Sequence, residues 1–172
     1  MILIEFSGCL DEQRKFGDMQ ISSPAFKNGE IIPQKYTCHG ADISPPLNFS
    51  SIPESTKSLA IILEDPDAPG RIWVHWIVYN LPNTTISLPE NAGAEGNENL
   101  PSGAEHGVNS WSENNDFYRG PCPPSGTHRY YFRLYALDAV LNLEDGASKE
   151  QLQDAMSGHI IEEAELMGIC NA

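Results

Sequence analysis

Two histidines and one aspartate stand beside stiff loops rich in proline and glycine, in segments far apart in the chain. Asp65 opens a DPDAP segment, His75 lies within a WVHW segment, and His128 closes a loop that begins at Gly120. Imidazole N–H groups donate to phosphate oxygens, and a neighbouring carboxylate can fix the ring tautomer and support the imidazolium. If the fold brings these groups together, we expect a site for a small phosphorylated or carboxylate anion.

Each of these residues lies at the end of an expected β-strand. Residues 58–64 are a short apolar run between turn-forming residues, which is typical of a strand buried on both faces. Residues 73–81 are aromatic and β-branched, as strands are. Residues 128–138 alternate, so that one face carries His128, Tyr130, Phe132, Leu134 and Ala136.

The rest of the chain predicts a helix, a long loop and a leader. Ser148 and Gln151 have capping-box spacing, and apolar residues recur every three to four positions up to Met167, so we expect one helix near 148–167. We interpret 82–110 as a connecting loop with one helical turn, and such loops are often functional. Residues 1–18 look like a loosely attached leader, and 19–172 like a single domain.

The composition of the chain limits its fold class and the kinds of partner that it can bind. The 172 residues include 14 glycines and 13 prolines, which favours a turn-rich, mostly β protein. Ten Lys and Arg residues against 24 Asp and Glu residues give a formal charge of −14, which argues against a nucleic-acid partner or an anionic membrane surface. We find no secretory signal and no stretch near the ~18 apolar residues of a transmembrane segment, and we expect a cytoplasmic location.

The cysteines leave an open question. Four cysteines are too few for a disulfide scaffold, and we expect free thiols, although spacing alone cannot decide whether Cys38 and Cys122 lie close together. A metal site is a possible alternative, with ligand types that suit zinc but spacings that match no zinc signature; its candidate ligands are Cys38, His39, His75, Cys122 and His128. We therefore expect no cofactor and no physiological metal.

Four segments carry a resemblance to a known family. The chain from Phe26 to Met167 resembles the phosphatidylethanolamine-binding protein (PEBP) family in Pro45-Pro46-Leu47, DPDAP at 65–69, WVHW at 73–76 and the GTHRY segment at 126–130. Its details resemble the bacterial, Raf kinase inhibitor-like branch. The resemblance implies a β-sandwich of two antiparallel sheets with a few peripheral helices. It also implies a small pocket for phosphate, phosphorylethanolamine or a similar anion, and a homodimer.

The resemblance also assigns site residues. It implies ligand-binding roles for Asp65, His75, Gly120, Pro121, His128 and Tyr130, with a wall formed by Ala68, Pro69 and Trp73. It further implies a cis peptide bond at Ala68–Pro69. We expect the Gly120 N–H to be a free donor, because the following Pro121 has none. Eukaryotic members place an aromatic from a C-terminal helix over the site, which this chain lacks, so we expect a more open pocket and transfer no kinase-regulating role.

Three functions compete on these residues. Anion binding, with possible regulation of a partner through its phosphorylated groups, requires no chemistry and is our preferred hypothesis. An inhibitor of a protease or kinase would act through surface loops, chiefly 82–110. A hydrolase would pair Asp65 with an imidazole and use Ser110 or Cys122 as nucleophile, but Ser110 lacks a G-x-S-x-G elbow and Cys122 lies between prolines. We therefore expect no enzymatic activity.

Overall fold

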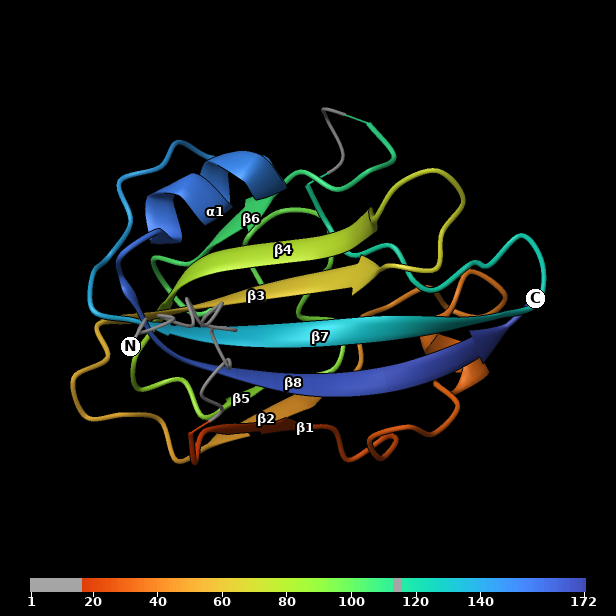
Figure 1. Ribbon diagram of the computed structural model, residues 1–172, viewed down its shortest axis with the longest axis horizontal. Helices are drawn as coiled ribbons and strands as arrows, with labels where there is room; N and C mark the ends of the chain where they lie inside the picture. The colour runs from red at the N-terminus through yellow and green to blue at the C-terminus, as the bar shows by residue number, and fades with distance from the viewer. Residues whose placement is uncertain (1–16, 113–115) are drawn as a thin grey trace, which may run out of the picture.

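Two antiparallel sheets face each other in the computed structural model, which describes residues 17–112 and 116–172 (Figure 1). The larger sheet has five strands, in the order β6 (Glu105–Gly107), β4 (Trp73–Pro82), β3 (Ser58–Asp65), β7 (Thr127–Leu137) and β8 (Ile160–Asn171). The smaller sheet has the order β1 (Gln20–Ser22), β2 (Leu47–Ser50) and β5 (Ser87–Leu88). The helical elements are the 3-10 helix η1 (Gln34–Tyr36) and α1 (Lys149–Met156). The expected mostly β sandwich is confirmed.

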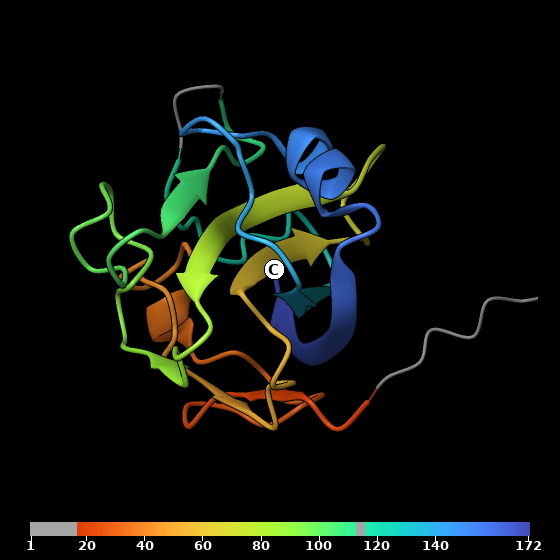
Figure 2. The ribbon, with the colours of Figure 1, turned by 90° about the vertical axis from the view of Figure 1, so that its left-hand side faces the viewer.

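The central strand β3 is buried along its whole length, as its apolar run predicts. Leu59, Ile61 and Leu63 face the core between the two sheets. Ala60 and Ile62 point the opposite way into a second cluster, which α1 covers with Leu152 and Met156 among others. In Figure 2 the smaller sheet lies below the larger one and α1 lies above it, so both faces of β3 are covered.

The expected helix at 148–167 is correct only in its first part. Ser148 caps α1 in a capping box with Gln151, but α1 ends at Met156, and Gly158 follows in a left-handed conformation with φ of 80°. From Ile160 the chain forms β8, which pairs with β7 from Leu137 to Thr127. A spacing of four residues fits a strand of period two as well as a helix, and pairing with β7 decides between them.

The structure also bears on the loop expected at 82–110 and on the leader expected at 1–18. The segment 82–110 has no helical turn and instead contributes β5, which pairs with β2, and β6, which pairs with β4. Most of the expected leader, residues 1–16, lies outside the described residues. Within the described part of the chain, no helix has the length and apolar character needed to cross a membrane.

Candidate functional site

One end of the larger sheet collects the ends of three strands. Asp65, the last residue of β3, pairs with Trp73, the first residue of β4. The strand β7 also runs antiparallel to β3 and begins at Thr127, so its first residues lie near the same end. The antiparallel pairing therefore brings the three sequence-predicted groups at 65, 75 and 128 into one region.

Asp65 and His128 form a buried pair. His128 Nδ1 lies 2.7 Å from Asp65 Oδ2, and the two residues are 7% and 3% exposed. Since a carboxylate can only accept a hydrogen bond, the Nδ1 atom of His128 carries the hydrogen, and Nε2 is the ring nitrogen outside this bond. The second oxygen, Oδ1, accepts the N–H of Asp67 at 2.8 Å. Both oxygens of this carboxylate therefore have donors, which reduces its repulsion of an anion.

The DPDAP loop is anchored to β7 by a second ion pair. Asp67 accepts hydrogen bonds from the Nε, Nη2 and backbone N–H of Arg129, at 2.9, 2.7 and 2.9 Å. The hydrogen bonds from the Arg129 side chain lower the pKa of Asp67 to about 2. The loop that follows Asp65 is therefore held in place at neutral pH.

His75 is a neutral, buried imidazole at neutral pH. Its Nδ1 lies 2.7 Å from the carbonyl oxygen of Arg119, so Nδ1 is the N–H donor. Burial lowers the pKa of His75 to about 4, although the carbonyl of Arg119 favours the charged form. Nε2 makes no hydrogen bond to a described residue, which leaves it for a ligand.

Tyr130 links the two imidazoles. Its ring lies 5.2 Å from the His75 ring in a T-shaped contact and 6.5 Å from the His128 ring in a stacked one. The Tyr130 hydroxyl is buried and makes no hydrogen bond of ordinary geometry to a described residue, although Asp65 and the Cys122 backbone are near enough to affect its pKa. Burial, followed by the negative charge of Asp65, raises the pKa of this phenol. A buried neutral hydroxyl without a hydrogen bond of ordinary geometry is costly, and a ligand or a water would satisfy it.

A cavity of about 320 Å³ opens beside these groups. Five residues assigned from the sequence line it: Asp65, Ala68, Pro69, Trp73 and His75. The same lining includes Trp111, Cys122 and Pro124, which were not among the ligand-binding and wall residues expected from the sequence. His128 and Tyr130 contact lining residues but are not part of the lining, and Gly120 and Pro121 are also outside it.

The expectation that the Gly120 N–H is a free donor is wrong. Its N–H is not free but donates to Asp42 Oδ1 at 2.6 Å. A Cβ at this position would lie 2.4 Å from the carbonyl oxygen of Tyr36, so close packing against the 36–42 segment requires glycine here. The same segment receives the Tyr118 hydroxyl, which donates to the Tyr36 carbonyl at 2.6 Å.

Both tryptophans of the cavity wall carry an arginine over the ring. The guanidinium of Arg71 lies 5.0 Å from the Trp73 ring centre, and that of Arg119 lies 5.6 Å from the Trp111 ring centre. The two indoles contact each other edge to face at 5.5 Å. Two positive charges therefore lie beside the cavity wall, although Arg119 Nε is also 3.7 Å from Asp42 Oδ2 and Asp65 is part of the lining.

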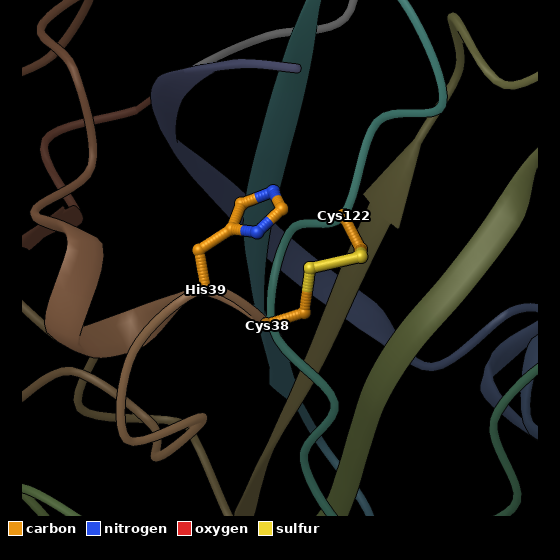
Figure 3. A group of neighbouring side chains, drawn as sticks. All are labelled: Cys38, His39 and Cys122. Carbon is orange, nitrogen blue, oxygen red and sulfur yellow. A yellow bond between two sulfur atoms is a disulfide. The ribbon is translucent and has the colours of Figure 1, made fainter.

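Two covalent expectations are corrected. No peptide bond among the described residues is cis, so the expected cis bond at Ala68–Pro69 is absent, and the loop accommodates the trans isomer that X–Pro bonds ordinarily prefer. Cys38 and Cys122 are not free thiols but form a disulfide across a Cα separation of 5.4 Å, because folding brings their two loops together (Figure 3). Cys170 is free and buried, and Cys9 lies outside the described residues.

The same geometry bears on the metal and hydrolase alternatives. The described residues bring Cys38, His39 and Cys122 together, without His75 or His128. Cys122 cannot act as a nucleophile while its sulfur is bonded to Cys38. The Ser110 hydroxyl accepts the N–H of Val74 at 2.8 Å.

Three larger hollows lie elsewhere on the described surface. One of about 740 Å³ is lined by the starts of β4 and α1, including Arg71 and Lys149. A second, of about 570 Å³, includes Ile31, His39 and Cys170, and a third, of about 350 Å³, includes Met19 and Asn28. None of them contains Asp65, His75 or His128, so we place the candidate site in the smaller cavity, where buried polar groups converge.

The chain belongs to the phosphatidylethanolamine-binding protein family, whose model matches residues 22–171. A protein named UPF0098 from Methanothermobacter thermautotrophicus is 50% identical over 151 residues, 88% of this chain and 97% of that protein. The crystal structure of CT736 from Chlamydia trachomatis, titled a PEBP homolog, matches with a TM-score of 0.80 and 47% identity, over 90% of this chain and 97% of that one. Escherichia coli YbcL, titled a member of the mammalian PEBP family, matches with a TM-score of 0.85 and 33% identity, over 91% of this chain and 99% of that one.

Proposed function

We propose that the chain binds a small phosphorylated or carboxylate anion in the cavity lined by Asp65 and His75, without catalysis. The observation that carries the proposal is the position of His75. It lines the cavity, its Nδ1 is committed to the Arg119 carbonyl, and its Nε2 has no described partner. Family membership supports the same kind of ligand, for which phosphorylethanolamine is the first head group to test.

The protonation of His75 decides how an anion binds. With a pKa of about 4, the free imidazole presents a lone pair at Nε2 at neutral pH, and a lone pair repels an anionic oxygen. Binding therefore requires a proton between Nε2 and the ligand. Either the imidazole takes one up as the anion enters, or a protonated phosphate donates its own. Both routes make binding weaker as pH rises.

The surroundings supply the remaining attraction. The positive charges of Arg71 and Arg119 lie over the two tryptophans of the wall, and the Tyr130 hydroxyl makes no hydrogen bond of ordinary geometry to a described residue. The net charge of −14 opposes long-range attraction of an anion, so affinity depends on short-range hydrogen bonds and local charge. Solvated charges farther away than the Debye length of about 8 Å are largely screened at physiological salt.

The inhibitor alternative receives less support. The segment 82–110 is tied to both sheets through β5 and β6 and is not a free loop.

We also expect a homodimer and a cytoplasmic location, which light scattering and cell fractionation would test. In a reducing cytoplasm the Cys38–Cys122 pair would be present as thiols.

Titration of inorganic phosphate and of phosphorylethanolamine, followed by tryptophan fluorescence, tests the proposal. Trp73 and Trp111 line the cavity and would report its occupation. We expect saturable quenching that is lost in His75→Ala and reduced in Trp111→Leu, which keeps Trp73 as a reporter. No saturation with either compound, in a protein whose folding is verified by circular dichroism, would reject an anion site here.

A further inference from the structure

A second group of chemically reactive side chains lies next to the cavity. Cys38, His39 and Cys122 place their potential ligand atoms within 4.8 Å of one another (Figure 3). His39 and Cys122 are exposed and Cys38 is half-buried, so solvent reaches the group. In the oxidised protein the two sulfurs are bonded to each other and cannot act as thiolate ligands.

The two loops that carry the cysteines are held together without the disulfide. The Cys38 N–H donates to the Pro121 carbonyl at 3.1 Å, beside the sulfur–sulfur bond. The Gly120–Asp42 and Tyr118–Tyr36 hydrogen bonds described above join the same two segments, each at 2.6 Å. Reduction would therefore leave the two thiols as neighbours rather than release them.

The position of His39 is also fixed by its backbone. Its N–H donates to Thr37 Oγ1 at 3.3 Å, and its carbonyl accepts the Gln34 side-chain amide at 3.0 Å. Its ring makes no hydrogen bond to a described residue, so either ring nitrogen is free to bind a metal. Two thiolates and an imidazole are ligands that zinc prefers, and the fourth position of its tetrahedron can hold water.

We propose that the reduced protein binds one zinc-like divalent cation through the thiolates of Cys38 and Cys122 and the imidazole of His39. A dithiol reductant supplies two electrons and two protons, the disulfide becomes two thiols, and the reductant becomes a disulfide. The cation then displaces the two thiol protons and forms two metal–sulfur bonds and one metal–nitrogen bond. A disulfide oxidant that accepts the two electrons and becomes two thiols restores the Cys38–Cys122 bond, and the cation is released. The net charge of −14 favours a cation, and the site does not depend on anion binding.

Cobalt(II) is a suitable probe, because cobalt–thiolate bonds absorb in the near ultraviolet. The full chain would be reduced with dithiothreitol, desalted without oxygen into buffer free of phosphate, and titrated with Co²⁺. We expect one Co²⁺ per reduced chain, displaced by Zn²⁺, and no such absorption from the oxidised chain. Near-ultraviolet circular dichroism would follow the fold of the reduced protein, and loss of that signal would overturn the argument that the loops stay together.

Variants assign the ligands. The double variant Cys38→Ser/Cys122→Ser retains Cys9 and Cys170 and should lose the cobalt–thiolate absorption. His39→Ala should raise the Kd for Co²⁺ by roughly tenfold or more, since even loss of an outer-shell partner costs about that much. His159→Ala, an exposed histidine paired with Asp138, is the matched control and should bind as the unmodified chain does. Absorption that persists in the double variant, or an unchanged affinity in His39→Ala, would overturn the proposed ligand set.

Discussion

Asp65 and His128 are 63 positions apart in the chain, yet their side chains form a 2.7 Å hydrogen bond inside the fold. The molecule contains a second pair of the same chemistry and length, His159 with Asp138, which lies on the surface. The side chains of the inner pair are 9% and 4% exposed, and those of the outer pair 47% and 53%. Comparing the two pairs therefore separates the effect of the hydrogen bond itself on the stability of the fold from the effect of its burial.

Removal of Asp65 should destabilise the fold far more than removal of Asp138. Asp65→Ala leaves a buried imidazole and the Asp67 N–H without their acceptor, and losing one partner of a buried pair typically costs about 3–5 kcal/mol. Asp138→Ala should cost about 0–1 kcal/mol, because an exposed pair is screened by water. Urea unfolding at neutral pH measures both, and equal losses would contradict the structural role assigned to Asp65.

Acid should weaken the fold through His75. Its pKa is lowered from 6.5 to about 4 in the folded chain, so the unfolded chain binds the proton more readily. The neutral ring's contribution is complete above pH 6.5, is lost as pH falls towards 4, and amounts to roughly 3 kcal/mol at 1.36 kcal/mol per pKa unit.

The measurement is the free energy of unfolding against pH in the unmodified chain and in His75→Gln. The variant should lose part of the decline between pH 6.5 and 4. The remainder stays, since burial also lowers the pKa of His106. Superimposable slopes for the two chains would show that His75 is not a buried neutral histidine.

Neutralising the arginines over the cavity wall should weaken anion binding. Arg71→Gln and Arg119→Gln each remove a positive charge close to a lining tryptophan, so the Kd for phosphate should rise and its dependence on salt should decrease. Lys57→Gln is the control, because Lys57 is exposed and precedes β3 at the end opposite Asp65. A control that weakens binding as much as the two test variants would mean that only net charge matters.

Loss of the disulfide should lower stability without abolishing the fold. The Cys38–Cys122 bond spans 84 positions, and removing such a crosslink typically costs about 2–4 kcal/mol. The two hydrophobic clusters and both sheets remain, so Cys38→Ser/Cys122→Ser should unfold cooperatively at a lower urea concentration. A double variant without a cooperative transition would show that the loop contacts depend on the disulfide.

Strand positions were predictable where the local pattern had one interpretation. Residues 58–64 and 128–138 carry enough apolar or alternating character to specify strands, and both form them. The 148–167 segment was ambiguous because Met156, Ile160 and Ala164 are spaced by four, which fits both a helix and a strand. The edge of β7 resolves that ambiguity, and it is remote in sequence.

The cavity was predictable only in part for a similar reason. Asp65 and His75 stand at strand ends, where polar residues are conspicuous against apolar runs. Trp111 and Cys122 come from irregular segments whose approach to the cavity depends on the tertiary fold. The spacing of Cys38 and Cys122 carried no information about their distance, because the segments on either side set it.

The most direct test of the proposed anion site is calorimetric titration of sulfate into the unmodified chain and His75→Gln, over roughly pH 5.5 to 8.5, around the ordinary histidine range. Sulfate carries no proton in this range, so any proton in the complex must come to the protein. We predict that the unmodified chain takes up one proton per sulfate and binds more weakly as pH rises, whereas His75→Gln binds independently of pH. An affinity that does not change with pH in the unmodified chain, or the same pH dependence in both chains, would contradict the account.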